Sequence, residues 1–206
     1  MDYRLREWLF EFKQSKKKLA FALIFFLIAV VVYITSGDYV TDRASSVVSH
    51  DLILDHIGPY NLSILYVGLS TIVIALVFLY PLISKPREFP YVLVMFSLFL
   101  IVRSGFIIFT HLRTPTGAII VAFPGILRFF NFSNDLFFSG HTGLPFLGFL
   151  IFKNHKKISY FMLVSSIIMG IIVLLMHVHY SIDVLSAFFI TYGVYKIGNY
   201  LNLGFE

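Results

Sequence analysis

His179 and Asp183 stand four residues apart near the C-terminal end of the 206-residue chain. On a helix this spacing puts both side chains on one face about one turn apart, close enough for imidazole and carboxylate to hydrogen-bond. The carboxylate would fix the tautomer and support an imidazolium, so the other ring nitrogen could attack an electrophile such as phosphorus. The same spacing also fits an interfacial histidine that bonds to an aspartate for packing alone.

A second histidine, His141, follows Ser139 and Gly140. The glycine would let an anion approach the backbone, and free N–H groups at the start of a helix bind anions such as phosphate. His141 would then be placed to protonate a leaving oxygen. We therefore pair His141, as acid or base, with His179 as nucleophile.

Arg103 is a cation within an apolar run, about eight residues (~12 Å of helix) from the end of that run. Such a residue is costly to bury in a membrane and marks a functional site by default. We interpret it as a fixed positive charge that faces phosphate oxygens. The alternative is an arginine that extends to the membrane surface, and its depth argues against that.

The elements that must position these residues are membrane helices. Only 13% of the residues are charged and 58% are hydrophobic, whereas soluble domains have about 25% charged residues. The chain has no cysteine, which excludes disulfides and thiolate sites. The net charge of +5 is no sign of a nucleic-acid partner, because the basic residues cluster at the ends of apolar runs as topology signals.

Apolar runs separated by charged or turn-rich breaks predict an all-α, polytopic bundle of six membrane helices. The expected spans are Leu19–Ser36, Asn61–Ser84, Pro90–His111, Leu136–Phe152, Ile158–Met176 and Ser181–Leu201. The fourth is short and contains Pro145. An apolar patch, Gly117–Leu127, lies in the loop before it, and whether that patch enters the membrane stays open.

Lysine and arginine predict the orientation. Twelve of them fall at the N-terminus, in the second and fourth breaks and near the C-terminus, whereas the opposite loops hold only Arg43, Arg113 and Arg128. Because positive loops stay in the cytoplasm, both termini are expected there. The histidine sites then lie on the non-cytoplasmic side.

The chain is expected to divide into a cytoplasmic amphipathic segment, residues 1–18, and a membrane domain, residues 19–206. Residues 3–14 alternate Trp8 and other apolar side chains with charged ones, which predicts a short helix on the membrane surface. A clear small-x-small motif is missing, so we expect no cleavage of a signal peptide here.

Two blocks carry a resemblance to a known family: Asp135-Leu-Phe-Phe-Ser-Gly-His-Thr142 and His177-Val-His-Tyr-Ser-Ile-Asp-Val184. They resemble the signature blocks of sphingomyelin synthases, a branch of the type 2 phosphatidic acid phosphatase superfamily. Arg103 resembles a residue of that branch's preceding block, and Asp51 and Asp55 its first-loop motif. The resemblance covers roughly residues 50–195.

The resemblance implies a metal-independent enzyme with no cofactor, which acts on a phospholipid or lipid phosphate at the non-cytoplasmic leaflet. It implies that His179 forms a phosphohistidine, that Asp183 is its partner and that His141 is the acid/base. With Arg103, Ser139 and Gly140, we assign Arg113 and Tyr180 to substrate binding. Phe138 stands where the broader superfamily has proline, and such departures bear on the headgroup.

Three questions stay open. The acceptor that resolves the intermediate is water, ceramide or diacylglycerol, so the activity is that of a phosphatase or a phosphotransferase. A different class is a metal enzyme or transporter built on His141, His177, His179 and Asp183, because His-x-His with a carboxylate can bind zinc or iron. A non-catalytic membrane scaffold is the third class.

Overall fold

The structure, a computed structural model, describes residues 3–43, 48–125, 132 and 134–201. Arg128 and the last two residues of the 117–127 patch lie outside this part. All regular structure within it is helical. The elements in chain order are α1 (Tyr3–Gln14), α2 (Lys16–Arg43), the 3₁₀ turn η1 (Leu54–His56), α3 (Ser63–Ser84), α4 (Phe89–Phe109), α5 (Gly140–Ile151), α6 (Lys156–Leu175) and α7 (Ser181–Tyr200).

The predicted all-α membrane architecture is confirmed. Four helices, α2, α3, α4 and α6, are long and apolar enough to cross a membrane. The other two elements of the expected six differ. Helix α5 has 12 residues, about 18 Å, which is too short to cross a hydrocarbon core of about 30 Å by itself. Helix α7 has 20 residues and carries Asp183 and Lys196.

The fourth expected span begins four residues late because its first residues are not helical. Residues 136–139 approach α5 as irregular chain, and Ser139 in extended conformation is the N-cap residue. Helix α2, by contrast, is longer than expected and continues to Arg43, well past the expected end at Ser36. The site therefore begins at a capped helix start and not inside a membrane-spanning helix.

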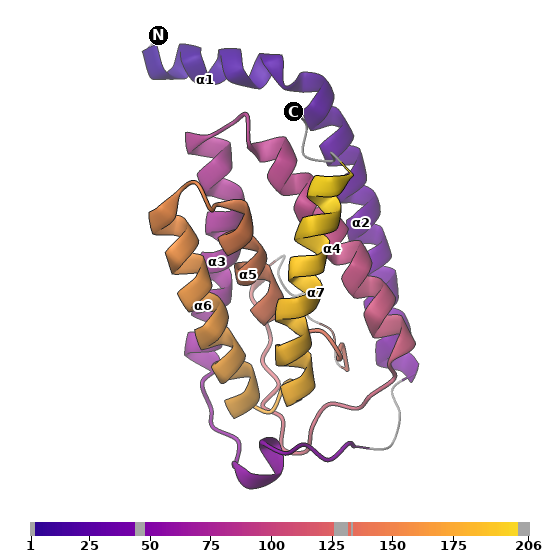
Figure 1. Ribbon diagram of the computed structural model, residues 1–206. Coiled ribbons are helices and arrows are strands. Elements are labelled where there is room, and N and C mark those ends of the chain that lie inside the picture. Colours follow the sequence, from indigo (N-terminus) through magenta and orange to yellow (C-terminus); the bar gives the residue numbers. More distant parts are fainter. Residues whose placement is uncertain (1–2, 44–47, 126–131, 133, 202–206) are drawn as a thin grey trace.

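Helix α4 is the centre of the bundle. In its most apolar window 61% of the residues are buried, compared with 22% for α2 and for α3. Its aromatic residues Phe96 and Phe99 pack with Phe138 before α5 and with apolar residues of α2 and α7 in the largest core cluster. Helices α2 and α3 turn much of their surface, including Leu27 and Ile72, outward to the surrounding lipid. Figure 1 shows α2 along α4, with α5 between α6 and α7.

Helix α1 runs across the end of the bundle that also holds the last turn of α7 and the α3–α4 turn (Figure 1). The Trp8 indole N–H donates to the carbonyl of Leu82 at 2.8 Å. Arg87 Nε lies 3.3 Å from a carboxylate oxygen of Glu11. The predicted short helix is present, while its place on the cytoplasmic surface stays a prediction.

The loops at the opposite end are tied to the start of α7. Asp51 accepts hydrogen bonds from the backbone N–H of Ser181, at 2.7 Å, and from the Ser181 hydroxyl. Burial raises the pKa of the Asp51 carboxyl, but hydrogen bonds from Ser181, Leu54 and Ile53 outweigh it and hold the pKa below its ordinary value. The 48–60 loop thus supplies a carboxylate to the N-terminus of another helix.

Candidate active site

Ser139 begins α5 and places the two residues that follow it. Its side chain accepts a hydrogen bond from the Thr142 N–H at 3.4 Å, and its own surface is fully buried. Such a cap satisfies one of the free N–H groups of a helix start. Ser139, predicted to contact substrate, is here a helix cap that sets Gly140 and His141 in the first turn.

Gly140 allows Arg103 to approach the backbone. A β-carbon added at Gly140 would lie 2.9 Å from Nε of Arg103, closer than such atoms come without a shift. The glycine therefore leaves room for a buried guanidinium beside the start of α5. Its predicted role was to let an anion approach the backbone. On the side where a β-carbon would lie, that space holds the Arg103 guanidinium.

Asp183 holds His179 in one orientation. Its carboxylate lies 3.1 Å from Nδ1 of His179 and accepts backbone N–H groups of Tyr180 and Phe137, each at 3.0 Å. The aspartate has no exposed surface, and His179 is 5% exposed. An ionised carboxylate is acceptor-only, so Nδ1 carries the proton and Nε2 of His179 has the free lone pair.

The structure brings His141 to His179, although 38 residues separate them in the sequence. Their ring centroids are 6.3 Å apart. The backbone N–H of Ser139 donates to the Asp183 carbonyl at 3.1 Å, which joins the starts of α5 and α7. A cavity of about 60 Å³ between them is lined by both histidines. A water takes about 30 Å³ of liquid, so this space suits a small polar group.

Two aromatic residues that sequence reasoning missed hold His141. The Tyr66 hydroxyl lies 2.9 Å from Nε2 and 3.1 Å from Nδ1 of His141. Phe123, from the 117–127 patch, stacks on His141 at 5.7 Å between ring centroids and also contacts the Tyr66 ring at 5.2 Å. The described part of that patch thus folds back onto the site. Neither residue belongs to a polar motif, so the sequence held no signal for them.

Arg103 is bound differently from the prediction. Arg103 and His141 line the same large cavity, but the Arg103 guanidinium forms an ion pair with Asp135. It also donates to the Tyr33 hydroxyl at 2.9 Å and to the Phe138 carbonyl at 3.0 Å, and is 2% exposed. Asp135 therefore neutralises the charge assigned to phosphate. Asp135 is the first residue of the sequence block 135–142, but the sequence did not show that Arg103 is its partner.

Tyr180 packs among the loops, and its predicted contact with substrate stays a prediction. It is 3% exposed and packs with Leu54 and Leu136. Its hydroxyl donates to the Arg113 carbonyl at 2.8 Å and accepts the Ser49 N–H at 3.2 Å. Burial raises the pKa of the Tyr180 phenol. The Arg113 side chain is exposed, and the next residue, Thr114, lines the small cavity.

The set proposed for a metal does not converge. The ring nitrogens of His177 lie 3.0 Å from the carbonyl oxygen of Thr116 and 2.8 Å from that of Ile57, so His177 joins two loops. Its backbone adopts a left-handed conformation with φ of 57°. Among the described residues no three His, Asp or Glu side chains are grouped as metal ligands.

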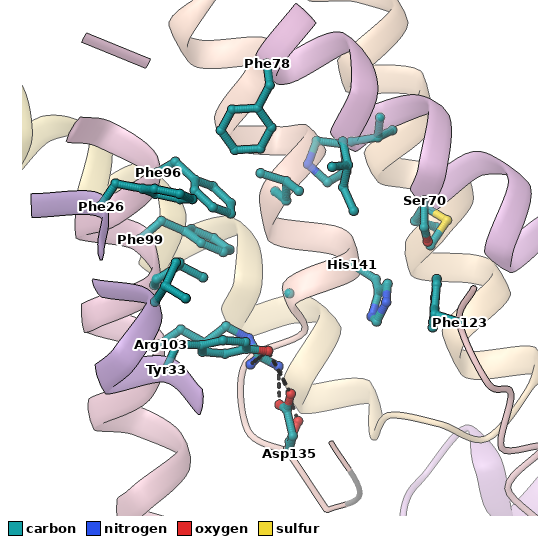
Figure 2. A pocket seen from close by; sticks show the side chains of 18 of the residues that line it. Phe26, Tyr33, Ser70, Phe78, Phe96, Phe99, Arg103, Phe123, Asp135 and His141 are labelled. Carbon is teal, nitrogen blue, oxygen red and sulfur yellow. Dashed lines mark hydrogen bonds and ion pairs between the residues drawn. The ribbon is translucent and has the colours of Figure 1, made fainter. Parts of the chain in front are cut away.

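A larger cavity of about 400 Å³ continues from His141 into the apolar interior. Figure 2 shows Arg103, Tyr33 and Asp135 on one side of it, Ser70 and Phe123 on the other, and His141 between them. Away from this polar end its walls are apolar, with Phe26, Phe78 and Phe96 among them. Leu27 lines it and is also 63% exposed on the outside of the bundle, so the cavity opens toward lipid beside α2.

Residues 133–200 match the family model described as PAP2 superfamily C-terminal. Over these residues the chain is similar to the PAP2 superfamily. The match contains both histidine blocks, with His141, His179 and Asp183, and ends with α7. No curated protein and no solved structure shows a significant match to the chain. Together with the apolar helices, the PAP2 domain supports a membrane-bound phosphatase-type enzyme that acts on a lipid phosphate.

Proposed function

We propose that the chain transfers the phosphoryl group of a phospholipid or lipid phosphate through a phosphohistidine on His179. The observation that carries this proposal is the geometry of His179. Asp183 holds its Nδ1 at 3.1 Å, and its ring lies 6.3 Å from that of His141 across a small cavity. A nucleophile oriented by a carboxylate and faced by a second acid/base is the arrangement that phosphoryl transfer through histidine needs.

In the first step Nε2 of His179 attacks phosphorus, and the bond from phosphorus to the leaving oxygen breaks. His141 gives its proton to that oxygen, and Asp183 stabilises the positive charge that develops on the His179 ring. In the second step a hydroxyl attacks the phosphohistidine and passes its proton to His141. The nitrogen–phosphorus bond then breaks and free His179 returns.

Binding of the phosphate is assigned to the start of α5 and to Arg113. The first N–H groups of a helix bind anions, and α5 begins at Gly140, next to His141 at the small cavity. Arg113 is exposed on the loop beside the small cavity and makes no ion pair among the described residues. We give Arg103, with its charge already paired to Asp135, the task of holding the residues before α5 in place.

The large apolar cavity supports a lipid substrate. A hydrocarbon chain of lipid length would replace contacts with the membrane by contacts with the apolar walls around Phe26, Phe78 and Phe96. The opening beside Leu27 would admit the lipid from the membrane. An apolar, water-poor space next to His141 also favours a lipid alcohol, ceramide or diacylglycerol, over water as acceptor. This is the sphingomyelin synthase-like reading of the site.

The charge distribution supports a site on the non-cytoplasmic leaflet. The twelve basic residues assigned to the cytoplasm lie in or beside α1, in the α3–α4 and α5–α6 turns and near the end of α7. His141 and His179 lie at the other ends of α5 and α7.

The test is turnover by purified protein in detergent or lipid nanodiscs. Phosphatidic acid, ceramide phosphate, phosphatidylcholine and phosphatidylethanolamine are supplied with and without ceramide or diacylglycerol, and products are read by mass spectrometry. Activity should survive chelation, vanish in His179→Ala and persist in His155→Ala, whose histidine pairs with Glu88 at the other end of the bundle. No product from any of these lipids, or unchanged turnover in His179→Ala, would reject the proposal.

A further inference from the structure

Ser70 is a buried hydroxyl without a partner that lines the large cavity. It lies on α3 and is 5% exposed. Its Oγ has no hydrogen-bond partner among the described residues. A buried polar group left unpaired destabilises a protein, and most such groups are paired.

Other buried serines in the membrane helices show what Ser70 lacks. The hydroxyls of Ser97 and Ser104 on α4 turn back to the carbonyl four residues earlier, at 2.6 and 2.8 Å. This is the usual solution for serine inside a helix. Two further buried atoms without partners belong to His111 and Thr191, and neither residue lines this cavity. Of these three residues, Ser70 is the one that lines the large cavity.

The depth of Ser70 relates it to the phosphate site. Tyr66 and Ser70 stand one turn apart on the buried stripe of α3, so Ser70 lies about 6 Å deeper along the helix. The Tyr66 hydroxyl contacts His141. In Figure 2 Ser70 lies on the same side of the cavity as Phe123, with His141 beside them. A lipid with its phosphate between the histidines and its chain in the cavity must pass Ser70.

We propose that Ser70 hydrogen-bonds the oxygen-bearing group next to the phosphate ester of the lipid: a hydroxyl, or an ester or amide carbonyl, on the second or third carbon. This group stands a few bonds from phosphorus, a span comparable with the one-turn step from Tyr66 to Ser70. The inference rests on the proposed function for the position of the phosphate. It makes Ser70 a specificity residue that favours glycerol- or sphingoid-based lipids over plain alkyl phosphates.

The first arm of the test measures kcat/KM on two substrates of matched chain length: dipalmitoyl phosphatidic acid, which has the second-carbon ester, and hexadecyl phosphate, which lacks it. Ser70→Ala should lower kcat/KM for phosphatidic acid about 3- to 10-fold, the worth of one neutral hydrogen bond. For hexadecyl phosphate it should change less than about 2-fold. Ser97→Ala, a buried serine outside the cavity, should leave the preference for phosphatidic acid unchanged. Equal effects of Ser70→Ala on both substrates, or no effect on either, would overturn the inference.

The second arm measures binding without turnover, as the thermal stabilisation of the full chain by dipalmitoylglycerol and by hexadecanol. Removal of an unpaired hydroxyl should leave the empty protein as stable as before, so Ser70→Ala remains testable. It should reduce stabilisation by dipalmitoylglycerol and not by hexadecanol. If the protein turns over no phospholipid but shows this difference, the proposed function fails and Ser70 keeps its role. If it turns over phosphatidic acid and neither arm responds to Ser70→Ala, only the role of Ser70 fails.

Discussion

Replacing Asp183 with asparagine tests whether His179 depends on a carboxylate. Asp183 accepts three N–H groups: Phe137 on one oxygen, and Tyr180 with His179 Nδ1 on the other. Asparagine has one acceptor and one donor end, so it cannot reproduce this set in either orientation.

Each orientation has a different cost. With the amide oxygen toward Phe137, the NH₂ group faces His179 and favours the tautomer whose Nε2 carries the proton, which removes the nucleophilic lone pair. With the oxygen toward His179, the NH₂ group opposes the Phe137 N–H and leaves a buried donor unpaired. Such a donor costs about 1–3 kcal/mol of folding free energy. Neither orientation supplies the negative charge that stabilises the imidazolium.

We expect turnover of the preferred lipid phosphate to fall about 10³- to 10⁴-fold in Asp183→Asn. Loss of an orienting aspartate by the same change costs about 10⁴ in a protease triad. The assay is initial rate in detergent, together with trapping of acid-labile phosphohistidine and the thermal unfolding midpoint. The chain offers a matched control in the exposed pair of His50 and Asp55, also at 3.1 Å. Asp55→Asn should change neither rate nor stability appreciably. A folded Asp183→Asn protein with more than a tenth of the parent rate would refute this account of the site.

Four further predictions follow from the same contacts. His141→Ala should slow lipid substrates far more than a nitrophenyl phosphate ester, whose leaving group needs little protonation; equal damage to both would mean that His141 is not the acid. Arg103→Met should cost about 3–5 kcal/mol in unfolding free energy because it leaves the buried Asp135 carboxylate without its counter-charge, and adding Asp135→Leu should recover most of it. A cysteine placed at Asp51 or Arg113 in this cysteine-free chain should react with an impermeant reagent only from the non-cytoplasmic side, and labelling from the cytoplasm alone would reverse the orientation. Because the folded pKa of Asp51 is lowered, its contribution to stability is complete above its ordinary pKa near 4 and is lost as the pH falls through the lower folded value. In Asp51→Asn the thermal unfolding midpoint should therefore depend less on pH in that acidic range.

The sequence predicted the helices well because membrane helices are marked by long apolar runs. The expected ends of the spans at Ser84, His111 and Met176 are within about two residues of the observed ends at Ser84, Phe109 and Leu175. The start of α5 was missed because residues 136–138, before Ser139, are as apolar as a membrane helix, while the Ser139 cap decides where the helix begins. Periodicity reports which residues avoid water, and not which N–H groups find a partner.

Site residues were predictable where both partners lie on one helix or its start. His179 and Asp183 are an example, because their spacing alone allows the contact. Partners from distant segments were not predictable: Asp135 for Arg103, Tyr66 for His141 and Ile57 for His177. Arg103 shows this limit most clearly, although its predicted contact with phosphate stays a prediction. A buried cation in a membrane predicts a counter-charge, and the sequence does not say whether that charge belongs to a substrate or to the protein.

Backbone hydrogen bonds between the segments that carry the two histidines set the distance between their rings. The Ser139 N–H donates to the Asp183 carbonyl at 3.1 Å, and the Phe137 N–H donates to the Asp183 carboxylate at 3.0 Å. Asp183 therefore orients His179 and also ties the residues before α5 to α7. Because Arg103 binds the same stretch through the Phe138 carbonyl and Asp135, α4 takes part in this constraint. Arg103 then belongs to the scaffold that fixes His141, and loss of its charge should act on rate through the position of that histidine.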